Sequence, residues 1–203
     1  MRKIALIPAA LALSAGMALA QTNPEVEDGP GPNLVIELAD AQGNAKGTIV
    51  LDLFEDVAPA HTERLVELAR SGAYDGVVFH RVIEGFMAQT GDVENGRQGG
   101  DIAMAGTGGS DLPDLPAEFS DRPFQRGTVG MARSMDPNSA NSQFFINFDR
   151  TPFLDGEYTV VGQLVEGWEV LDQIRLGDPS RAGNGRVDSP DYMASVTVAE
   201  SAE

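Results

Sequence analysis

The sequence predicts a mainly β fold, either a closed antiparallel barrel or a sandwich, that carries two helices. Three observations support this fold class: short alternating apolar segments recur along the chain, only two segments have helical periodicity, and turn residues separate the segments at regular spacing. Two helices are too few for alternating βαβ units. A closed antiparallel barrel with one helix over each end fits the order of the segments best. The chain shows no internal repeat and no second domain.

The first two strands are expected to form an antiparallel hairpin. Residues 33–40, NLVIELAD, and residues 47–54, GTIVLDLF, carry an apolar residue at every second position. A period of two places one face of each strand against a core. The intervening DAQGNAKG supplies the turn. The residues expected to face the core are Leu34, Ile36, Leu38, Ile49, Leu51 and Leu53.

Two segments are expected to be helices. In residues 58–72, APAHTERLVELARSG, Pro59 suits the first turn and Gly72 can end the helix. Residues 166–175, EGWEVLDQIR, form the second expected helix. Both carry an inward apolar stripe, which consists of Leu65, Leu68 and Ala69 in the first helix and of Val170, Leu171 and Ile174 in the second.

The other strands are expected to be short. Residues 77–92, VVFHRVIEGFMAQTGD, are interpreted as two strands joined at Glu84-Gly85. Residues 91–127 are rich in glycine and acid and lack a clear period, so they are expected to be a long loop with room for one short strand. The remaining strand candidates are GTVGMA (127–132), QFFINF (143–148), YTVVGQLV (158–165) and MASVTVA (193–199).

The first twenty residues are predicted to be a secretory signal peptide. Arg2 and Lys3 precede an uncharged apolar stretch over residues 4–19, and Ala-Leu-Ala at 18–20 is a small-x-small cleavage pattern. A retained membrane anchor is the alternative, but a proline and a glycine interrupt the segment and no charged stop follows. Cleavage before Gln21 would place the mature protein in the periplasm or outside the cell.

Residues 21–33 are expected to be a flexible leader, because prolines and glycines are combined there with three acids. Residues 34–203 then form a single domain. Loss of the two basic residues of the signal peptide takes the net charge from −17 to −19. This acidity argues against nucleic acid and anionic membrane surfaces as partners of the mature protein. The chain has no cysteine, so disulfides, thiol catalysis and cysteine-based metal sites are excluded.

The residues that usually perform acid–base or phosphate chemistry lack the necessary context. No serine stands in a nucleophile motif beside His80, and we expect this histidine to be structural, with a bond to the backbone. His61 lies near the start of the first helix. GTGG, residues 106–109, is a weak phosphate motif because no Lys-Ser or Lys-Thr follows it. Four acids of the long loop lack the alternation of a calcium site and are interpreted as solvated charges: Asp92, Asp101, Asp111 and Asp114.

A different kind of site is suggested by Arg81, which stands inside an apolar strand. Phe86, Met87 and Gln89 follow it, and SANSQFFINF later combines Gln143 with two phenylalanines. If these strands are neighbours, they form an apolar pocket edged by a guanidinium and two amides. Such a pocket suits a small apolar group beside a peptide bond and does not suit proton transfer. Alternatively the apolar residues are core and Arg81 only reaches the surface; the pattern leaves both readings open.

Five co-linear segments resemble the cyclophilin-type peptidyl-prolyl cis-trans isomerases. FHRVIEGFMAQTGD resembles the family signature; it follows GTIVLDLFEDVAPAHTERLVELARSGAYDG and precedes GTVGMARS, NSANSQFFIN and FLDGEYTVVGQLVEGWEVLD in the family's order. The resemblance covers about residues 34–198. It implies an eight-stranded antiparallel barrel capped by two helices, with the site on the outer face. It also implies that the protein needs no cofactor and no metal.

The resemblance assigns roles to eleven residues. Arg81 matches the catalytic arginine. The other ten match positions that bind the substrate. The pocket for the proline ring corresponds to Phe86, Met87, Phe145 and Leu154; the amides that hold the substrate backbone correspond to Gln89 and Gln143; the groove edge that meets the residue before proline corresponds to Ala132 and Arg133; and two further groove positions correspond to Phe153 and Tyr158.

Some of these positions depart from the family pattern. Arg133 stands where asparagine is common, Phe153 where many eukaryotic members have tryptophan, and Tyr158 where they have histidine. These changes resemble a bacterial, exported branch of the family. The segment MDPNSANS and the loop over residues 92–119 are also longer than usual, which leaves the rim of the groove undefined.

The resulting hypothesis is a monomeric, exported prolyl isomerase that binds proline-containing segments of unfolded or partly folded chains. It works without a cofactor or covalent intermediate. The rival hypothesis is a chaperone or adaptor that binds proline segments with little isomerase activity, and the altered groove rim motivates it. A hydrolase is a distant third reading, because no nucleophile is visible.

Overall fold

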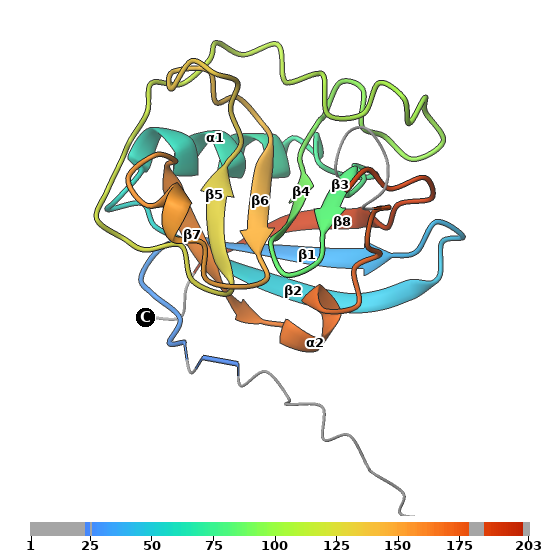
Figure 1. Ribbon diagram of the computed structural model, residues 1–203, viewed down its shortest axis with the longest axis horizontal. Helices are drawn as coiled ribbons and strands as arrows, with labels where there is room; N and C mark the ends of the chain where they lie inside the picture. Colours follow the sequence, from blue (N-terminus) through green and yellow to red (C-terminus); the bar gives the residue numbers. More distant parts are fainter. Residues whose placement is uncertain (1–22, 25, 179–184, 201–203) are drawn as a thin grey trace, which may run out of the picture.

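The computed structural model describes residues 23–24, 26–178 and 185–200. This part of the chain forms eight strands and two α-helices. The strands pair antiparallel throughout. In chain order the elements are β1 Asn33–Ala39, β2 Ala45–Leu53, α1 Pro59–Arg70, β3 Arg81–Ile83, β4 Met87–Thr90, β5 Thr128–Met131, β6 Phe144–Asn147, the 3-10 turn η1 Pro152–Leu154, β7 Val160–Glu166, α2 Trp168–Leu171 and β8 Tyr192–Ala199. They form one sheet in the order β3-β4-β6-β5-β7-β2-β1-β8 (Figure 1).

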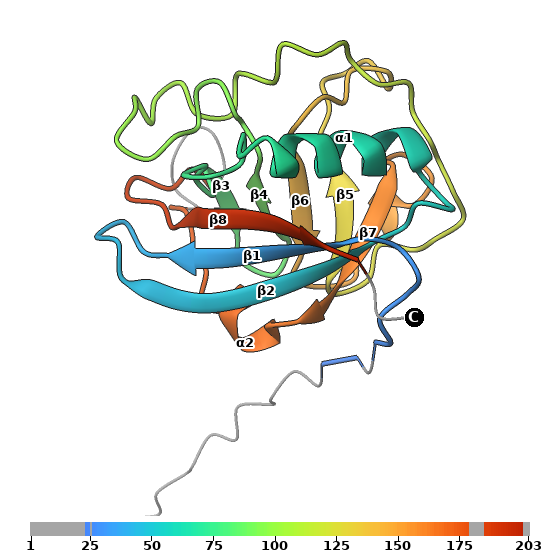
Figure 2. The same cartoon turned by 180° about the vertical axis from the view of Figure 1, so that it is seen from behind.

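The predicted hairpin is confirmed. β1 and β2 pair with Ile36 opposite Ile49, and all six residues expected to face the core are at most 1% exposed. The first helix is also confirmed: Leu65 is fully buried and Gly72 follows the helix at a φ of +71°. Figures 1 and 2 place α1 and α2 at opposite ends of the curved sheet.

The second helix is shorter than expected. α2 has only four residues, although Val170, Leu171 and Ile174 are buried as predicted. After α2 the backbone bonds shorten to i→i−3, as in the bond from the amide of Ile174 to the carbonyl of Leu171. The chain then turns so that the amide of Arg175 donates to the carboxylate of Asp191 at 2.8 Å. This long-range bond competes with continuation of the helix.

The expected closed barrel is wrong in one respect, because the sheet forms an open barrel. Its end strands β3 and β8 share no ladder among the described residues. The two ends meet through the isolated bridge between Val78 and Tyr192 and through backbone bonds of the 185–191 loop. β3 is only three residues long. It is therefore too short to pair along β8, and loop residues occupy its free edge.

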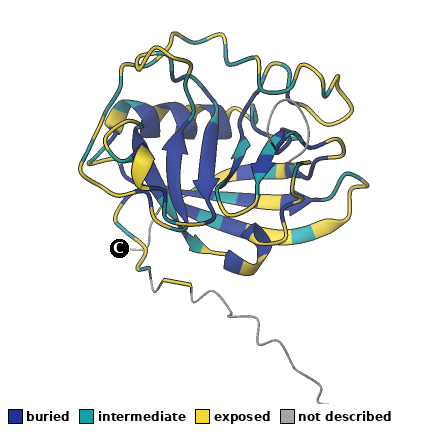
Figure 3. Cartoon of the chain, in the orientation of Figure 1, coloured by how far each residue is buried: buried dark blue, intermediate teal, exposed yellow. Residues whose placement is uncertain are grey.

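Two apolar clusters lie on the two faces of the central strands. Phe144 belongs to the large cluster inside the barrel, whereas its neighbour Phe145 belongs to a smaller cluster on the outer face. Phe124 from the long loop and Leu154 from η1 cover that outer cluster. Both faces are therefore buried, which explains why every residue of β5 and β6 is buried (Figure 3).

The segment before β1 contacts the barrel. The amide of Gly29 donates to Asp52 at 3.1 Å, the carbonyl of Pro32 accepts the amide of Leu53, and Val26 packs against the large cluster. This part of the predicted flexible leader is thus attached to β2. The predicted signal peptide lies outside the described residues, and among the described residues no helix is long and apolar enough to span a membrane.

The long loop forms few regular elements, as predicted. Its contribution to pairing is limited to isolated bridges, Val77 with Arg97 and Leu115 with Ala140. Side chains hold it instead. Glu118 accepts the amides of Ala60 and His61 at the start of α1, at 3.3 and 3.1 Å.

Candidate functional site

The candidate site begins with a row of residues across four neighbouring strands. Arg81 of β3 lies opposite Gln89 of β4, which lies opposite Phe145 of β6, and Phe145 lies opposite Gly130 of β5. Directly opposed residues point to the same face of a sheet. A Cβ at Gly130 would lie 2.5 Å from Phe145 Cζ, so only glycine lets that ring lie across β5. The row therefore puts a guanidinium, an amide and an aromatic ring side by side on the outer face.

These residues surround a small apolar pocket. The pocket has a volume of about 130 Å³. Nine of the eleven predicted site residues line it, namely Arg81, Phe86, Met87, Gln89, Ala132, Arg133, Phe145, Leu154 and Tyr158. The two others lie beside it. Gln143 bonds to Gln89 at 2.9 Å, and Phe153, which is 67% exposed, packs against Phe86 at the rim.

The floor of the apolar pocket is buried and packed by aromatic rings. Met87 and Phe145 are 1% and 5% exposed. The Phe145 ring stacks on Phe124 at 5.7 Å and meets the edge of Tyr158 at 5.9 Å. Aromatic packing of this kind stabilises a fixed ring orientation. The two readings of the sequence are therefore both partly correct, because these residues are core and line a pocket.

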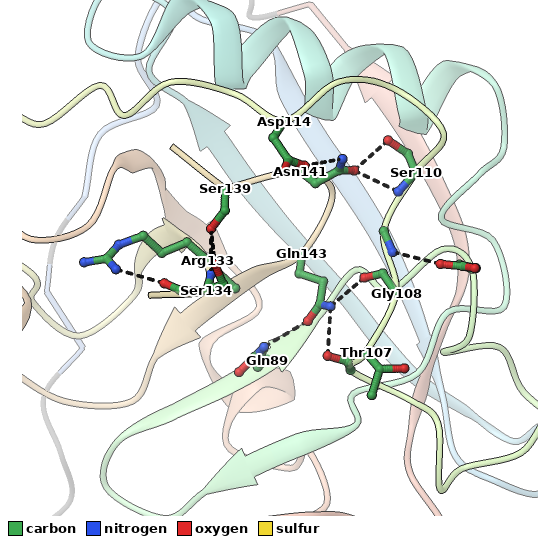
Figure 4. Close-up of a pocket in the computed structure, with 14 residues that line it drawn as sticks. Gln89, Thr107, Gly108, Ser110, Asp114, Arg133, Ser134, Ser139, Asn141 and Gln143 are labelled. Atoms are coloured by element: carbon green, nitrogen blue, oxygen red, sulfur yellow. Dashed lines mark hydrogen bonds between the residues drawn. The ribbon is translucent and has the colours of Figure 1, made fainter. Parts of the chain in front are cut away.

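A chain of hydrogen bonds holds Arg81 at the mouth of the pocket. Its Nη1 donates to Gln89 Oε1 at 3.3 Å, and Gln89 Nε2 donates to Gln143 Oε1 at 2.9 Å. Gln143 Nε2 then donates to the carbonyls of Gly106 and Gly108 at 3.2 and 2.8 Å (Figure 4). Burial lowers the pKa of Arg81. The ordinary pKa of arginine is so high that the guanidinium stays charged at neutral pH.

A larger polar cavity of about 400 Å³ continues from the apolar pocket. The two share Gln89, Ala132 and Arg133 as walls. The carboxylates of Glu94 and Asp114 line its far side. Hydroxyl and amide side chains line much of the rest (Figure 4), namely Thr107, Ser110, Ser134, Ser139, Asn141 and Gln143.

Arg133 lines both hollows, but its guanidinium is bound to the wall of the groove. Its guanidinium donates to the carbonyl of Glu157 at 2.8 and 3.2 Å and lies 4.4 Å over the Tyr158 ring. Figure 4 shows the side chain directed away from the polar cavity. The departure from the family pattern at this position thus reinforces one wall of the groove and leaves the acids of the polar cavity facing the solvent.

Neither histidine is placed for acid–base catalysis. Burial lowers the pKa of His80 to about 4, so its ring is neutral at pH 7. The predicted backbone contact of His80 is with Val78, which opposes the lowering of the pKa, although neither ring nitrogen has a partner with full hydrogen-bond geometry in the described part of the chain. His61 is fully buried, and its Nδ1 lies 2.6 Å from Glu118. Burial lowers the pKa of His61 as well.

The sequence interpretation was wrong for Asp92. Asp92 is fully buried, although it was taken as a solvated loop charge. It accepts the amides of Glu94, Asn95, Gly106 and Gly108 at 2.7–3.2 Å. One feature of the sequence could have predicted this contact, because a glycine-rich turn such as GTGG presents free backbone amides to an anion. The anion is an acid of the same chain.

No group of three or more His, Asp or Glu side chains is arranged to hold a metal ion among the described residues. The open barrel and its arginine-edged pocket match the class of protein that the sequence motifs resemble. The residues that line the pocket offer mainly apolar contact and hydrogen bonding.

Comparison with known proteins assigns the family. The family described as cyclophilin type peptidyl-prolyl cis-trans isomerase/CLD matches residues 36–198. A probable peptidyl-prolyl cis-trans isomerase of Brucella suis is 51% identical over 196 residues, which cover 95% of this chain and 96% of the relative. A peptidyl-prolyl cis-trans isomerase of Synechococcus elongatus is 41% identical over 135 residues, 66% of this chain and 86% of the relative.

A solved structure agrees with this assignment. The cyclophilin AquaCyp293 from Hirschia baltica has a TM-score of 0.65 and 26% identity, and the match covers 84% of this chain and 74% of that one. The chain therefore belongs to the cyclophilin-type peptidyl-prolyl cis-trans isomerase family. Its enzyme class is that of the isomerases which interconvert the cis and trans forms of X-Pro bonds.

Proposed function

We propose that this chain is an exported member of the family that accelerates X-Pro isomerisation in unfolded or partly folded proteins of the periplasm or the cell exterior. The observation that supports the site is the guanidinium of Arg81 at the mouth of an apolar pocket floored by Met87 and Phe145. The signal-like residues 1–20 support export. Prolyl isomerisation is slow enough to limit folding, so newly exported chains are suitable substrates.

The reaction requires only rotation about one bond. The peptide C–N bond resists rotation by about 18–20 kcal/mol because the nitrogen lone pair is delocalised. In the transition state the amide is twisted and the lone pair returns to the prolyl nitrogen. Catalysis therefore requires that the twisted form be bound better than the planar form.

Arg81 and the apolar pocket can supply this preference. The pocket holds the proline ring while the preceding carbonyl swings through the groove. Arg81 donates a hydrogen bond to the prolyl nitrogen once the lone pair is localised there. This bond is stronger inside the pocket than in water, because the pocket excludes solvent around the charge. The family resemblance assigns Gln89 and Gln143 to the substrate backbone, and we propose that they contact it beside the pocket.

The test is catalysed exchange of an Ala-Pro peptide, followed by NMR or by a protease-coupled assay. Arg81→Ala should lower kcat/KM by about 100-fold or more, as loss of a transition-state donor does. Arg70→Ala is the matched control, because Arg70 is an exposed arginine that pairs with Glu200 far from the groove. Unchanged activity of Arg81→Ala would refute the catalytic assignment.

The second candidate function is a proline-binding chaperone or adaptor. The altered rim favours it: Arg133 is fixed on Tyr158, and Phe153 presents an exposed ring beside the pocket. The same peptide separates the two functions. Saturable binding without faster exchange would support the binding module, whereas faster exchange at catalytic protein concentration would support the isomerase.

The proposed location and oligomeric state need their own measurements. Expression of the full chain in a bacterium should yield a periplasmic or secreted product whose N-terminal residue is Gln21. The purified product should have the mass of one chain by light scattering, as proposed for a monomer. A product that stays with the membrane and retains its first residues would support the anchor instead.

A further inference from the structure

We propose that Asp92 is a positioning residue for isomerisation, which fixes the orientation of the Arg81 guanidinium through a glycine turn and two glutamine amides. This inference rests on the proposed role of Arg81. Asp92 does not contact the apolar pocket, so it would act only through the residues between. The experiment below separates its effect from that of Arg81 itself.

The buried carboxylate of Asp92 organises the turn. It is fully buried, and no cation pairs with it in the described part of the chain. A buried charge must be satisfied by hydrogen bonds. Oδ2 accepts the amides of Gly106 and Gly108 at 2.7 and 3.0 Å, and Oδ1 accepts those of Glu94 and Asn95 at 3.2 and 2.8 Å. The carboxylate thereby joins the start of the loop to the glycine turn.

The turn has little freedom to move. A Cβ at Gly108 would lie 2.7 Å from Asp92 Oδ1, and a Cβ at Gly106 would lie 2.8 Å from the ring of His80. The turn is thus packed between Asp92 and the residue that immediately precedes Arg81. Gly106 also has a φ of +92°, which favours glycine.

The turn determines how the two glutamine amides are oriented. The same two glycines that donate to Asp92 present their carbonyls to Gln143 Nε2. A carbonyl can only accept, so Gln143 must direct its NH₂ to the turn and its Oε1 to Gln89. Gln89 must then donate through Nε2 to Gln143, as Figure 4 shows, which leaves Gln89 Oε1 to accept from Arg81. Each amide thus sets the direction of the next.

If the glycine turn were displaced, the two glutamine amides would lose their fixed orientation. If the two carbonyls moved away, both glutamine amides could rotate by 180°, and Gln89 could present its NH₂ to the guanidinium. Two donors repel, so Arg81 would leave its position over the pocket. A buried acid outside the pocket can therefore affect a reaction that involves no proton transfer.

The test is Asp92→Asn, which keeps the size of the side chain but replaces one acceptor oxygen by a donor. We expect kcat/KM for an Ala-Pro peptide to fall about tenfold, and the NMR signal of the Arg81 Nε–Hε group to shift. Asp40→Asn is the control, because Asp40 also organises a turn by accepting two backbone amides, at 2.9 Å, but in the β1–β2 hairpin. The control should change neither quantity.

A double-mutant cycle distinguishes positioning from a general loss of stability. Asp92→Asn should change kcat/KM less than twofold in a Gln143→Ala background, because the connection to Arg81 is already broken. An equal tenfold loss in both backgrounds, or no loss in the wild-type background, would overturn the proposal. So would an unchanged Arg81 signal in Asp92→Asn.

Gly108→Ala provides a second route if Asp92→Asn does not fold. It displaces the turn while the carboxylate stays, and it should produce the same Arg81 shift and a similar loss of kcat/KM. If Gly108→Ala produced neither of these changes, the proposal would be contradicted. The failure of the proposed function has a different signature. In that case Arg81→Ala would retain activity, while the Arg81 signal in Asp92→Asn would still report whether the connection exists.

Discussion

Asp52 shows at the scale of one residue how burial can depend on a distant segment. It alternates with Leu51 and Leu53, so the pattern of β2 directs it outward, yet it is only 1% exposed. The segment before β1 covers it: Oδ2 accepts the amide of Gly29, and Oδ1 has no hydrogen-bond partner among the described residues. Burial, with a smaller contribution from the nearby Asp28, raises the pKa of Asp52 from 3.8 to about 6.

We expect Asp52→Asn to stabilise the protein at neutral pH. Below pH 3.8 both the folded and the unfolded chain carry a protonated Asp52, so the residue has no pH-dependent cost. As the pH rises toward 6, the unfolded chain ionises Asp52 more readily than the folded chain, so the free energy of unfolding falls. The loss is complete above about pH 6 and amounts to about 3 kcal/mol at most. Urea unfolding of both proteins at pH 7.5 and near pH 4 should show a gain that shrinks as the pH falls.

The covering segment gives the matching control for Asp52. In a chain that lacks residues 21–31, Asp52 would face water and its pKa would return toward the ordinary value. Asp52→Asn should then have little effect at either pH. A gain of equal size at every pH in the full chain would contradict the pKa explanation.

At the scale of an element, the start of α1 depends on a residue of the long loop. The first amides of a helix have no partner within it and carry partial positive charge. Glu118 accepts two of them, from Ala60 and His61, although it lies more than fifty residues away in sequence. This contact fixes the end of the loop against the helix.

We expect Glu118→Gln to lower the free energy of unfolding by about 1 kcal/mol, the usual contribution of a charged group at this end of a helix. Urea denaturation at pH 7 measures the difference. Glu67→Gln is the control, since Glu67 is exposed in the middle of α1. Equal effects of the two substitutions would show that Glu118 has no special role.

The elements also show which parts of the fold the sequence can predict. The strand alternation placed Ile36 and Ile49 correctly because local period decides which face is buried. The length of α2 could not be predicted in this way. It ends early because Asp191, sixteen residues after Arg175, accepts the amide of that residue. The openness of the barrel likewise depends on how far β3 extends, which pattern does not determine.

At the scale of the whole molecule, the site joins residues that are far apart in sequence. Pattern alone could not place Arg81 beside Phe145, and only the family resemblance brought them together. The structure then shows why both readings were partly right, since the outer apolar cluster packs as core and also lines the pocket. Asp92 was missed because its partners are backbone amides, which leave almost no pattern in the side chains.

The charge of the molecule should affect which clients it accepts. The chain carries a net charge of −17, and Glu94 and Asp114 line the polar cavity that continues from the apolar pocket. Neither acid forms an ion pair among the described residues. Arg133, the cation of the cavity wall, is held instead by the carbonyl of Glu157. We therefore expect the far side of the polar cavity, where the two carboxylates lie, to favour a positively charged peptide segment.

We expect a peptide with lysine two or three residues before proline to have a higher kcat/KM than its glutamate counterpart. At low salt the ratio of kcat/KM for the lysine peptide to kcat/KM for the glutamate peptide should be about three to ten. It should approach one near 1 M salt, where the Debye length is only about 3 Å. Glu94→Gln combined with Asp114→Asn should remove most of this difference, because these two carboxylates line the polar cavity that continues from the proline pocket. Glu37→Gln, an exposed acid on β1, should leave it unchanged. A ratio that is insensitive to both salt and the double substitution would show that net charge does not select the substrate.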